Sequence, residues 1–491
     1  MNYRMILRII SGIMVIEILA MVPSLIIACY TNDSAAQVGF VGAIGIAALI
    51  ALVNIAFFSL KKSQRTFYAR EGMVTTAAAW IVLSLIGALP FYISGRIPNF
   101  INAFFEIISG FTTTGASVVS DVEALGKALL FWRSFSHWLG GMGVLVFFLA
   151  LVPSFGISEG SALHLLRAES PGPSVGKIVP RMKDTASVLY RIYIALTILD
   201  IIFLLIGKMK LFDAFCIAFG TAGTGGFSVL NSGCATYTPF AQNVTTIFML
   251  MFGVNFSIYY YMLMRRGKQI VINEELRAYF FVVAVSIALV LMNVYGKTPD
   301  TSHFLPALRH SAFQVASIIT TTGYSTTNFD LWPSFAKTIL ICLMFVGACA
   351  GSTGGGIKVS RILILIKAIR RNTHEVFHPQ EIRTIRMDGN RVSERTLAHV
   401  QVYLAAYVFI VLVSLLLVSL DPANYSMTTN FSAVMATFNN IGPGFDAVGP
   451  VKNFAGYNDF STLVLCLDML LGRLEIFPIL VLFAPSTYRR T

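Results

Sequence analysis

Charge-free apolar stretches recur along the whole chain and define its structural class. Stretches such as Ala43–Leu60 and Leu404–Leu420 contain no charged residue. At ~1.5 Å of rise per residue, about 18 to 20 helical residues cross the ~30 Å hydrocarbon core of a bilayer. Two long apolar segments at the start of the chain, about Met5–Cys29 and Gln37–Leu60, predict a pair of N-terminal spanning helices, although the first contains Arg8 and Glu17. The pattern therefore predicts an all-α protein that crosses a membrane many times.

After these two helices, one arrangement of segments occurs four times at regular intervals. It consists of a long outer helix, a short apolar segment, a loop and a long inner helix. The short segments are Asn102–Phe111, Phe212–Gly220, Arg309–Ile319 and Asn430–Phe438. Each is roughly half as long as a spanning helix, which is typical of re-entrant half-helices, although hydropathy alone also permits buried amphipathic helices.

The loop after each short segment carries three small, β-branched or amide residues followed by glycine. Aligned on the glycines, these residues are Thr112, Thr113, Thr114, Gly115, Ala222, Gly223, Thr224, Gly225, Thr320, Thr321, Thr322, Gly323, Asn439, Asn440, Ile441 and Gly442. Potassium filters replace the water of a dehydrated ion with rings of backbone carbonyls, and glycine allows the dihedral angles that this requires. The C-terminal ends of four half-helices would add partial negative charge. One such loop is equally compatible with an ordinary turn, but four aligned copies predict four pseudo-repeats around one potassium-binding pore.

The inner helix of the third repeat, from about Pro333 to Arg371, is much longer than one crossing requires. It is interrupted by Gly351, Ser352, Thr353, Gly354, Gly355 and Gly356. Each glycine destabilises a helix by ~1 kcal/mol relative to alanine, so the break predicts a flexible gate beneath the filter, with Lys358 beside it. A Gly-rich cytoplasmic turn is the alternative. A phosphate-binding loop is excluded, because Ile357 separates the last glycine from Lys358.

A second gate candidate, Arg473, lies within the last inner helix at a predicted depth near the middle of the membrane. Charged residues at this depth usually face the protein interior or a water-filled cavity. A cation below the filter would raise the barrier to potassium, whereas a structural ion pair with Asp468 or Glu475 is the alternative. In the first short segment, Glu106 could either attract cations or bind neighbouring polar groups.

Composition supports the membrane assignment and narrows the function. Charged residues make up 12% of the 491 residues, against about a quarter in soluble domains. The net charge of +12 does not indicate nucleic acid, because a topology with both termini in the cytoplasm places most Lys and Arg on the cytoplasmic side. The sequence has no nucleophile–base constellation and no metal-like spacing of its six Cys, which argues against an enzyme.

Several motifs resemble the Trk/Ktr/HKT superfamily of potassium transporters, and most closely its TrkH branch. They are the filter glycines, His137–Gly143, Ala168–Pro173, Ala350–Lys358 and Gly472–Glu475, and the resemblance covers the whole chain. It implies potassium uptake across the inner membrane of a bacterium. It also implies a homodimer with one pore per subunit, and a cytoplasmic regulatory ring of TrkA type that carries the ATP or NAD sites.

The resemblance also bears on selectivity and coupling. Glycine at all four filter positions favours potassium over sodium within this superfamily, although no loop has the full Thr-Val-Gly-Tyr-Gly sequence of tetrameric potassium channels. A channel-like pore is the leading hypothesis. A proton- or sodium-coupled symporter is the alternative, but a proton relay would need several intramembrane carboxylates and few are visible.

These features divide the chain into seven segments. They are an N-terminal two-helix segment (1–70), the first pore repeat (71–152), a cytoplasmic linker (153–186), the second repeat (187–266), the third repeat with its broken inner helix (267–371), a basic cytoplasmic loop (372–397) and the fourth repeat (398–491). The basic loop could bind the regulatory ring or acidic lipid headgroups, or simply reflect the cytoplasmic excess of positive charge.

Overall fold

The computed structural model describes residues 1–57, 69–141, 143, 182–381 and 383–488, and its regular structure is almost entirely helical. Six of the described helices are long and apolar enough to cross a membrane, or seven if one bent pair counts as a single span. The strands of the described part, β1 (Arg386–Met387) and β2 (Asn390–Arg391), form one antiparallel hairpin. The prediction of a multi-pass, all-α membrane protein is confirmed for these residues.

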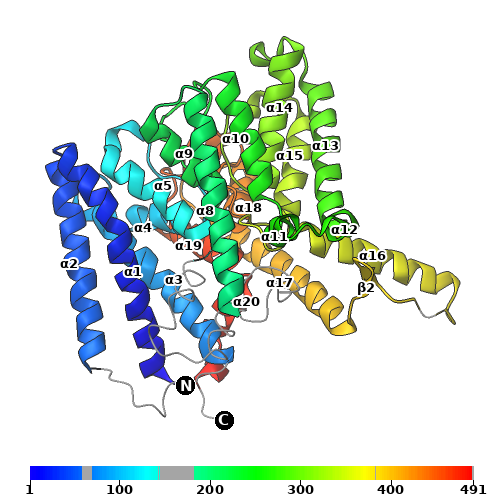
Figure 1. Ribbon diagram of the computed structural model, residues 1–491, viewed down its shortest axis with the longest axis horizontal. Coiled ribbons are helices and arrows are strands. Elements are labelled where there is room, and N and C mark those ends of the chain that lie inside the picture. The colour runs from blue at the N-terminus through cyan, green and yellow to red at the C-terminus, as the bar shows by residue number, and fades with distance from the viewer. Residues whose placement is uncertain (58–68, 142, 144–181, 382, 489–491) are drawn as a thin grey trace.

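Two antiparallel helices, α1 (Tyr3–Tyr30) and α2 (Ser34–Phe57), stand at one edge of the molecule (Figure 1). In the turn between them, Asp33 accepts a hydrogen bond of 3.1 Å from the amide of Ala36 and so caps the start of α2. The bounds of α1 agree closely with the predicted ones. Residues 58–60, where the second helix was predicted to end, lie outside the described residues, as does most of the predicted linker with the Ala168–Pro173 motif.

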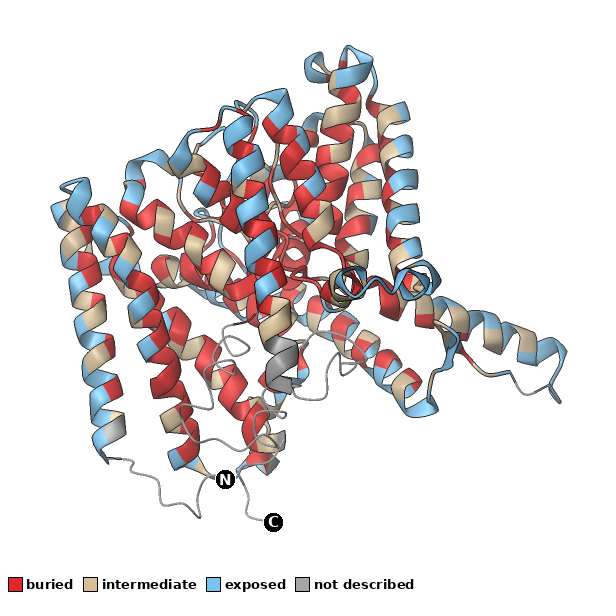
Figure 2. Ribbon diagram, viewed as in Figure 1, coloured by how far each residue is buried: buried red, intermediate tan, exposed pale blue. Residues whose placement is uncertain are grey.

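The rest of the described chain contains four successive units of a long helix, a short helix and an inner segment. The long helices are α3 (Ala69–Ile93), α8 (Met182–Ile206), α13 (Glu274–Val294) and α17 (Glu394–Val418). The short helices are α4 (Phe100–Phe111), α9 (Leu211–Gly223), α14 (Phe304–Ile319) and α18 (Met427–Phe438). The inner segments are α5 (Lys127–Gly141), α10 (Pro239–Phe252) with α11 (Phe256–Leu263), α15 (Ser334–Val346) with α16 (Val359–Phe377), and α19 (Asp459–Arg473) with α20 (Phe477–Phe483). Figure 2 shows buried residues concentrated where these elements meet and exposed residues along α2 and α13.

Shorter elements connect these units. They are α12 (Gly267–Ile272) and the 3-10 turns Glu123–Leu125, Pro299–Thr301, Phe329–Leu331, Asp446–Val448 and Pro485–Thr487.

All four short helices begin earlier than predicted, and in two of them, α4 and α18, a polar side chain ahead of the apolar run caps the start. The side chain of Asn99 accepts hydrogen bonds from the amides of Ile101 and Asn102 at the start of α4. Ser426 accepts one from the amide of Thr429 at the start of α18. With 12, 13, 16 and 12 residues, the four helices remain too short to span a bilayer.

Within the described residues, three of the inner segments are broken, whereas the sequence predicted a break only in the third repeat. Helices α10 and α11 meet at 90° across residues 253–255, and α19 is separated from α20 by residues 474–476. The break in the third repeat covers residues 347–358 and is longer than the predicted Gly351–Gly356. A Cβ on Gly253 would lie 2.6 Å from the Tyr279 hydroxyl, so close packing accounts for the glycine at the end of α10.

The predicted basic loop at 372–397 is largely structured. It contains the end of α16, the hairpin and the first residues of α17. Asp388 in the hairpin turn accepts a hydrogen bond of 2.7 Å from the amide of Glu274 and so caps α13. The Lys367 ammonium pairs with the Glu274 carboxylate, which ties α16 to the same helix end.

Candidate functional site

The four loops that follow the short helices share one backbone conformation. The second loop residue is left-handed in each, with φ of +57° at Thr113, +55° at Thr224, +59° at Thr321 and +54° at Asn440. The next residue donates its amide to a carbonyl five positions back in the short helix, at 2.8 Å in all four loops. Two residues after the left-handed position, a glycine has positive φ in every loop. These glycines are Gly115, Gly226, Gly323 and Gly442.

The shared conformation corrects the predicted alignment of the second loop. Gly226, with φ of +77°, occupies the position of Gly115, and Gly225 occupies the position of Thr114. Residues 223–226 therefore correspond to 112–115, and Ala222 lies in the last turn of α9. The sequence alignment was one residue out of register because this loop contains three glycines, and only the backbone shows which one has positive φ.

The four glycines also show how the loops are arranged around a centre. A Cβ added at Gly115 would collide with the carbonyl oxygen of Gly225, one at Gly226 with that of Thr322, and one at Gly323 with that of Ile441. A Cβ at Gly442 would lie 2.7 Å from the carbonyl oxygen of Thr114, back in the first loop. Each contact reaches the next repeat and the fourth returns to the first, so the loops form a closed ring. We call its glycine side the outer end and the side of the preceding threonines the inner end.

The hydroxyl and amide side chains of the loops form hydrogen bonds with other groups of the protein. Thr112 donates to the Ile108 carbonyl at 2.7 Å, and its oxygen lies 2.8 Å from that of Thr114. The same pair of contacts occurs at Thr320 and Thr322. Asn440 donates to the Thr114 hydroxyl at 2.9 Å and so joins the fourth loop to the first. These contacts hold the loops in place. Because the side chains differ from loop to loop, the backbone carbonyls are the oxygen groups that all four loops have in common.

Glycines of the inner segments let these helices approach the ring closely. A Cβ at Gly140 would collide with the carbonyl oxygen of Phe111, and one at Gly472 with that of Phe438. Phe111 and Phe438 are the last residues of α4 and α18, so the two helix pairs make equivalent contacts in the first and fourth repeats. The two motifs that contain Gly140 and Gly472 therefore have a packing reason for their glycines.

The break between α15 and α16, residues 347–358, is called the Gly-rich segment, and it packs against the inner end of the ring. The amide of Gly355 donates to the Thr321 hydroxyl at 2.6 Å. A Cβ at Gly354 would lie 2.8 Å from the carbonyl oxygen of Thr320, and one at Gly355 would collide with that of Asn439. Thr353 is buried and donates to the Phe252 carbonyl at 3.3 Å. The predicted gate residues are therefore in direct contact with two of the four loops of the ring.

Two further groups hold the ends of this segment. Lys358 is buried, and its ammonium donates to the Gly354 carbonyl, which closes the segment on itself. Glu275 in the first turn of α13 accepts from the amide of Ala350 at 2.7 Å and from the amide of Ser360 at 3.0 Å. Sequence reasoning missed Glu275, because a glutamate in the first turn of a helix is common and nothing in the sequence links it to residues so far away.

Arg473 lies between the Gly-rich segment and the first repeat. Its guanidinium donates to the carbonyl of Thr353 at 2.9 Å and to that of Gly141 at 2.8 Å, and it lies 3.3 Å from the Thr113 hydroxyl. The sequence placed it within one continuous inner helix, whereas it is the last residue of α19, because the chain turns away at residues 474–476.

The two carboxylates considered as partners of Arg473 have other contacts. Asp468 accepts from the Ser414 hydroxyl at 2.6 Å, and Glu475 pairs with Arg361 at 2.7 Å. The guanidinium charge thus lies beside the ring and the Gly-rich segment, among backbone carbonyls.

Known proteins resemble this chain over its full length. A family described as "TrkH: Cation transport protein" matches residues 38–489. The Trk system potassium uptake protein TrkH of Escherichia coli strain K12 is 34% identical over 500 residues, and that of Vibrio parahaemolyticus is 34% identical over 496 residues. Both alignments cover 100% of each chain.

A solved structure agrees with these sequence comparisons. The crystal structure of the potassium transporter TrkH from Vibrio parahaemolyticus superposes with a TM-score of 0.86 at 32% sequence identity, covering 100% of both chains. The resemblance inferred from the filter glycines and the other motifs is therefore confirmed, and the chain belongs to the TrkH family of cation transport proteins.

Proposed function

We propose that this protein takes up potassium across the cytoplasmic membrane of a bacterium, through a channel-like pore along the axis of the four-loop ring. As a member of a transport family, it is not an enzyme. The single observation that carries the proposal is the closed ring, in which each filter glycine packs on a carbonyl of the next repeat. Stacked backbone carbonyls around one axis can replace the hydration shell of potassium.

Selection is assigned to the ring and the ends of the short helices. The ion ligands are the carbonyls of residues 112–115, 223–226, 320–323 and 439–442. The four short helices end at the inner end of the ring, where their partial negative charges favour a cation. Backbone without regular structure is tolerated at membrane depth only where it lines a water-filled path or is buried in protein, and these loops meet that condition.

Closure of the pore is assigned to the segment at 347–358, which ends at Lys358, together with Arg473. The segment touches the inner end of the ring through Gly354 and Gly355, so an ion leaving the filter would meet it directly. Opening would break the hydrogen bond from Gly355 to Thr321 and move the segment aside. Helix α16 follows the segment directly, so a cytoplasmic partner that moves this helix would also move the segment.

Regulation and assembly are extended from the family. We assign the chain a homodimeric state, both termini in the cytoplasm, and control by a ring of nucleotide-binding subunits that carries any ATP or NAD. Contacts with anionic lipid headgroups are assigned to the basic residues at 372–397. The names of the relatives place them in a Trk system, which supports partner components for this chain as well.

Glu275→Gln is expected to increase potassium flux in the absence of the regulatory partner. The variant loses charge-assisted hydrogen bonds to the amides of Ala350 and Ser360, which are worth roughly 1.5–3 kcal/mol each, so the Gly-rich segment is held less firmly. Potassium efflux from proteoliposomes measures the change, expected at several-fold. Glu274→Gln is the matched control, because Glu274 contacts Lys367 and the hairpin rather than the Gly-rich segment. Equal effects of the two substitutions would contradict a specific role for Glu275.

Reversal potentials distinguish a channel from a coupled symporter. The symport alternative draws support from Glu17, Asp200 and Asp468, three carboxylates that are buried within apolar helices. Purified protein in liposomes with a potassium gradient is expected to reverse at the potassium Nernst potential, and to stay there when a proton or sodium gradient is added. A shift that follows the proton or sodium gradient would replace the channel hypothesis with coupled transport.

A further inference from the structure

The second filter loop is the one whose own side chains can do least to hold its shape. Three of its four ring positions are Gly223, Gly225 and Gly226. Glycine has more conformational freedom to lose than any other residue, so such a loop is flexible unless its surroundings restrain it. Its one side-chain hydrogen bond among the described contacts runs from the Thr224 hydroxyl to the Gly223 carbonyl at 2.6 Å, whereas the first and third loops each contain a hydroxyl pair such as Thr112–Thr114. Groups outside the second loop must therefore fix its carbonyls.

Three side chains from other elements converge on the residues just after Gly226. The ring of His137 occupies the space where a Cβ of residue 225 would lie, and it stacks on Phe227 with centroids 4.2 Å apart. The hydroxyl of Tyr324, from the third loop, donates to the Phe227 carbonyl at 3.4 Å. The Arg133 guanidinium lies 3.7 Å from the centre of the Phe227 ring and donates to the Ser228 carbonyl at 3.0 Å.

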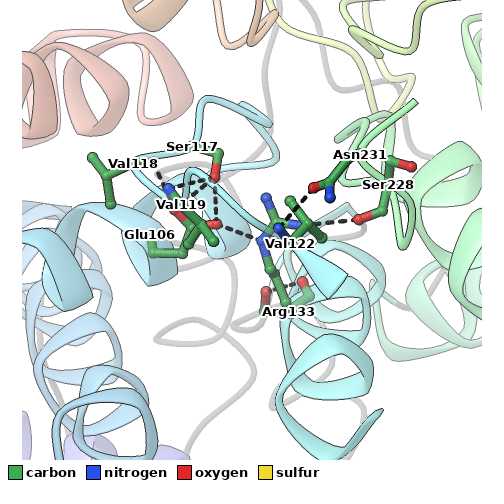
Figure 3. Close-up of polar contacts among 9 residues, drawn as sticks. Glu106, Ser117, Val118, Val119, Val122, Arg133, Ser228 and Asn231 are labelled. Carbon is green, nitrogen blue, oxygen red and sulfur yellow. Dashed lines mark hydrogen bonds and ion pairs between the residues drawn. The ribbon is translucent and has the colours of Figure 1, made fainter. Parts of the chain in front are cut away.

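Arg133 is itself held by a buried carboxylate that belongs to the first repeat. Glu106 in α4 pairs with Arg133 in α5, and the side chains are 0% and 3% exposed. The same carboxylate accepts from the Ser117 hydroxyl at 3.0 and 3.1 Å and from the Val118 amide at 3.0 Å. Figure 3 shows this chain of contacts, with Glu106 between the exit of the first loop and Arg133.

The pair therefore links the exits of two neighbouring filter loops. Glu106 holds the residues that follow Gly115, and Arg133 holds the residues that follow Gly226. Both oxygens of Glu106 bind protein groups and the residue is fully buried, so attraction of cations from solution is not its role. A buried ion pair whose groups are also hydrogen-bonded is rigid, because moving either partner leaves a buried charge without its counter-charge.

We propose that Glu106 and Arg133 are positioning residues for ion selectivity, which hold the outer ends of the first and second filter loops at a fixed separation. This inference rests on the filter function proposed above. A carbonyl ring discriminates between cations through the spacing and number of its oxygens. Without the pair, the glycine-rich second loop could adjust to a smaller ion, so sodium would be accepted more readily while potassium could still pass.

The decisive variant is Arg133→Lys, measured as the potassium-to-sodium permeability ratio and the potassium flux in proteoliposomes. Lysine keeps the positive charge beside Glu106 but lacks the planar fork that also reaches the Ser228 carbonyl and covers the Phe227 ring. We expect the ratio to fall about tenfold, as the loss of a charge-assisted hydrogen bond can produce, with little loss of potassium flux. A merely structural role would lower yield and flux together and leave the ratio unchanged.

Two further variants keep the test decisive if Arg133→Lys folds poorly. The double variant Glu106→Gln/Arg133→Met removes both charges at once and is expected to lose discrimination in the same way. Asn231→Ala is the matched control, because Asn231 joins the same two repeats through the Val122 amide at 2.8 Å, but at an exposed position. It is expected to keep the wild-type ratio, and a loss equal to that of Arg133→Lys would overturn the proposal.

Gly323→Ser separates the failure of this inference from failure of the filter assignment. If Gly323→Ser loses discrimination while Arg133→Lys and the double variant keep it, the positioning role is wrong and the filter stands. If all three keep the wild-type ratio, the filter assignment itself fails and the inference falls with it.

Discussion

Gly323→Ser is expected to abolish most of the discrimination between potassium and sodium. Gly323 has a φ of +84°, and a Cβ there would collide with the Ile441 carbonyl oxygen and lie 2.9 Å from the Pro443 ring. A side chain at a left-handed position costs roughly 1–2 kcal/mol, and the collision displaces a carbonyl that is proposed to bind the ion. Since ~1.4 kcal/mol of differential binding is a factor of ten, we expect the potassium-to-sodium permeability ratio to fall by about tenfold or more.

The control for this substitution is Gly296→Ser, in the same repeat. Gly296 has a similar φ of +70°, but a Cβ there would meet nothing within 4 Å. The control therefore has a similar backbone penalty without the collision, and it should keep the wild-type ratio. Gly115→Ser, on the other side of the ring, is expected to behave like Gly323→Ser. Wild-type discrimination in both ring variants, measured by ion flux into proteoliposomes, would rule out the filter assignment.

The sequence was sufficient to predict the short helices and three of the four loop alignments. Apolar segments of that length, followed by Thr-Thr-Gly or an equivalent, contain both signals that a filter loop needs. The second loop was misaligned by one residue because glycine tolerates either sign of φ, so Gly225 and Gly226 look equivalent in sequence. The difference appears only in packing, where Gly226 faces the Thr322 carbonyl and Gly225 faces the His137 ring.

Breaks in the inner helices were harder to predict than the loops. The break in the third repeat contains consecutive glycines, which are visible in the sequence. The break in the fourth contains Glu475 and Ile476, with φ of +57° and +68°. A β-branched residue is strongly disfavoured in this conformation, so no local rule predicts it and the surrounding structure must impose it. The contacts of Glu106 and Glu275 are equally non-local, since their partners lie on other elements.

Arg473→Met is expected to raise potassium flux while leaving selectivity unchanged. The guanidinium lies 2.9 Å from the Thr353 carbonyl of the proposed gate and 3.3 Å from the Thr113 hydroxyl at the inner end of the ring. An ion leaving the filter would therefore pass close to a fixed positive charge. Two like charges ~6 Å apart repel by about 3 kcal/mol at an effective dielectric constant of ~20. Water in the open pore reduces this barrier, so we expect a flux increase of about tenfold rather than the full exponential of the repulsion.

Arg473→Lys separates the charge from the hydrogen bonds. Lysine keeps the positive charge below the ring but cannot reproduce the fork that binds the carbonyls of Thr353 and Gly141 together. If the barrier is electrostatic, the lysine variant should conduct close to the wild-type rate and the methionine variant well above it. If both variants conduct equally fast, Arg473 closes the pore by holding the Gly-rich segment against the first repeat, and its charge is incidental. Because the filter glycines are untouched, the potassium-to-sodium ratio should stay at its wild-type value in both variants, and a fall in that ratio would place Arg473 among the groups that shape the filter itself.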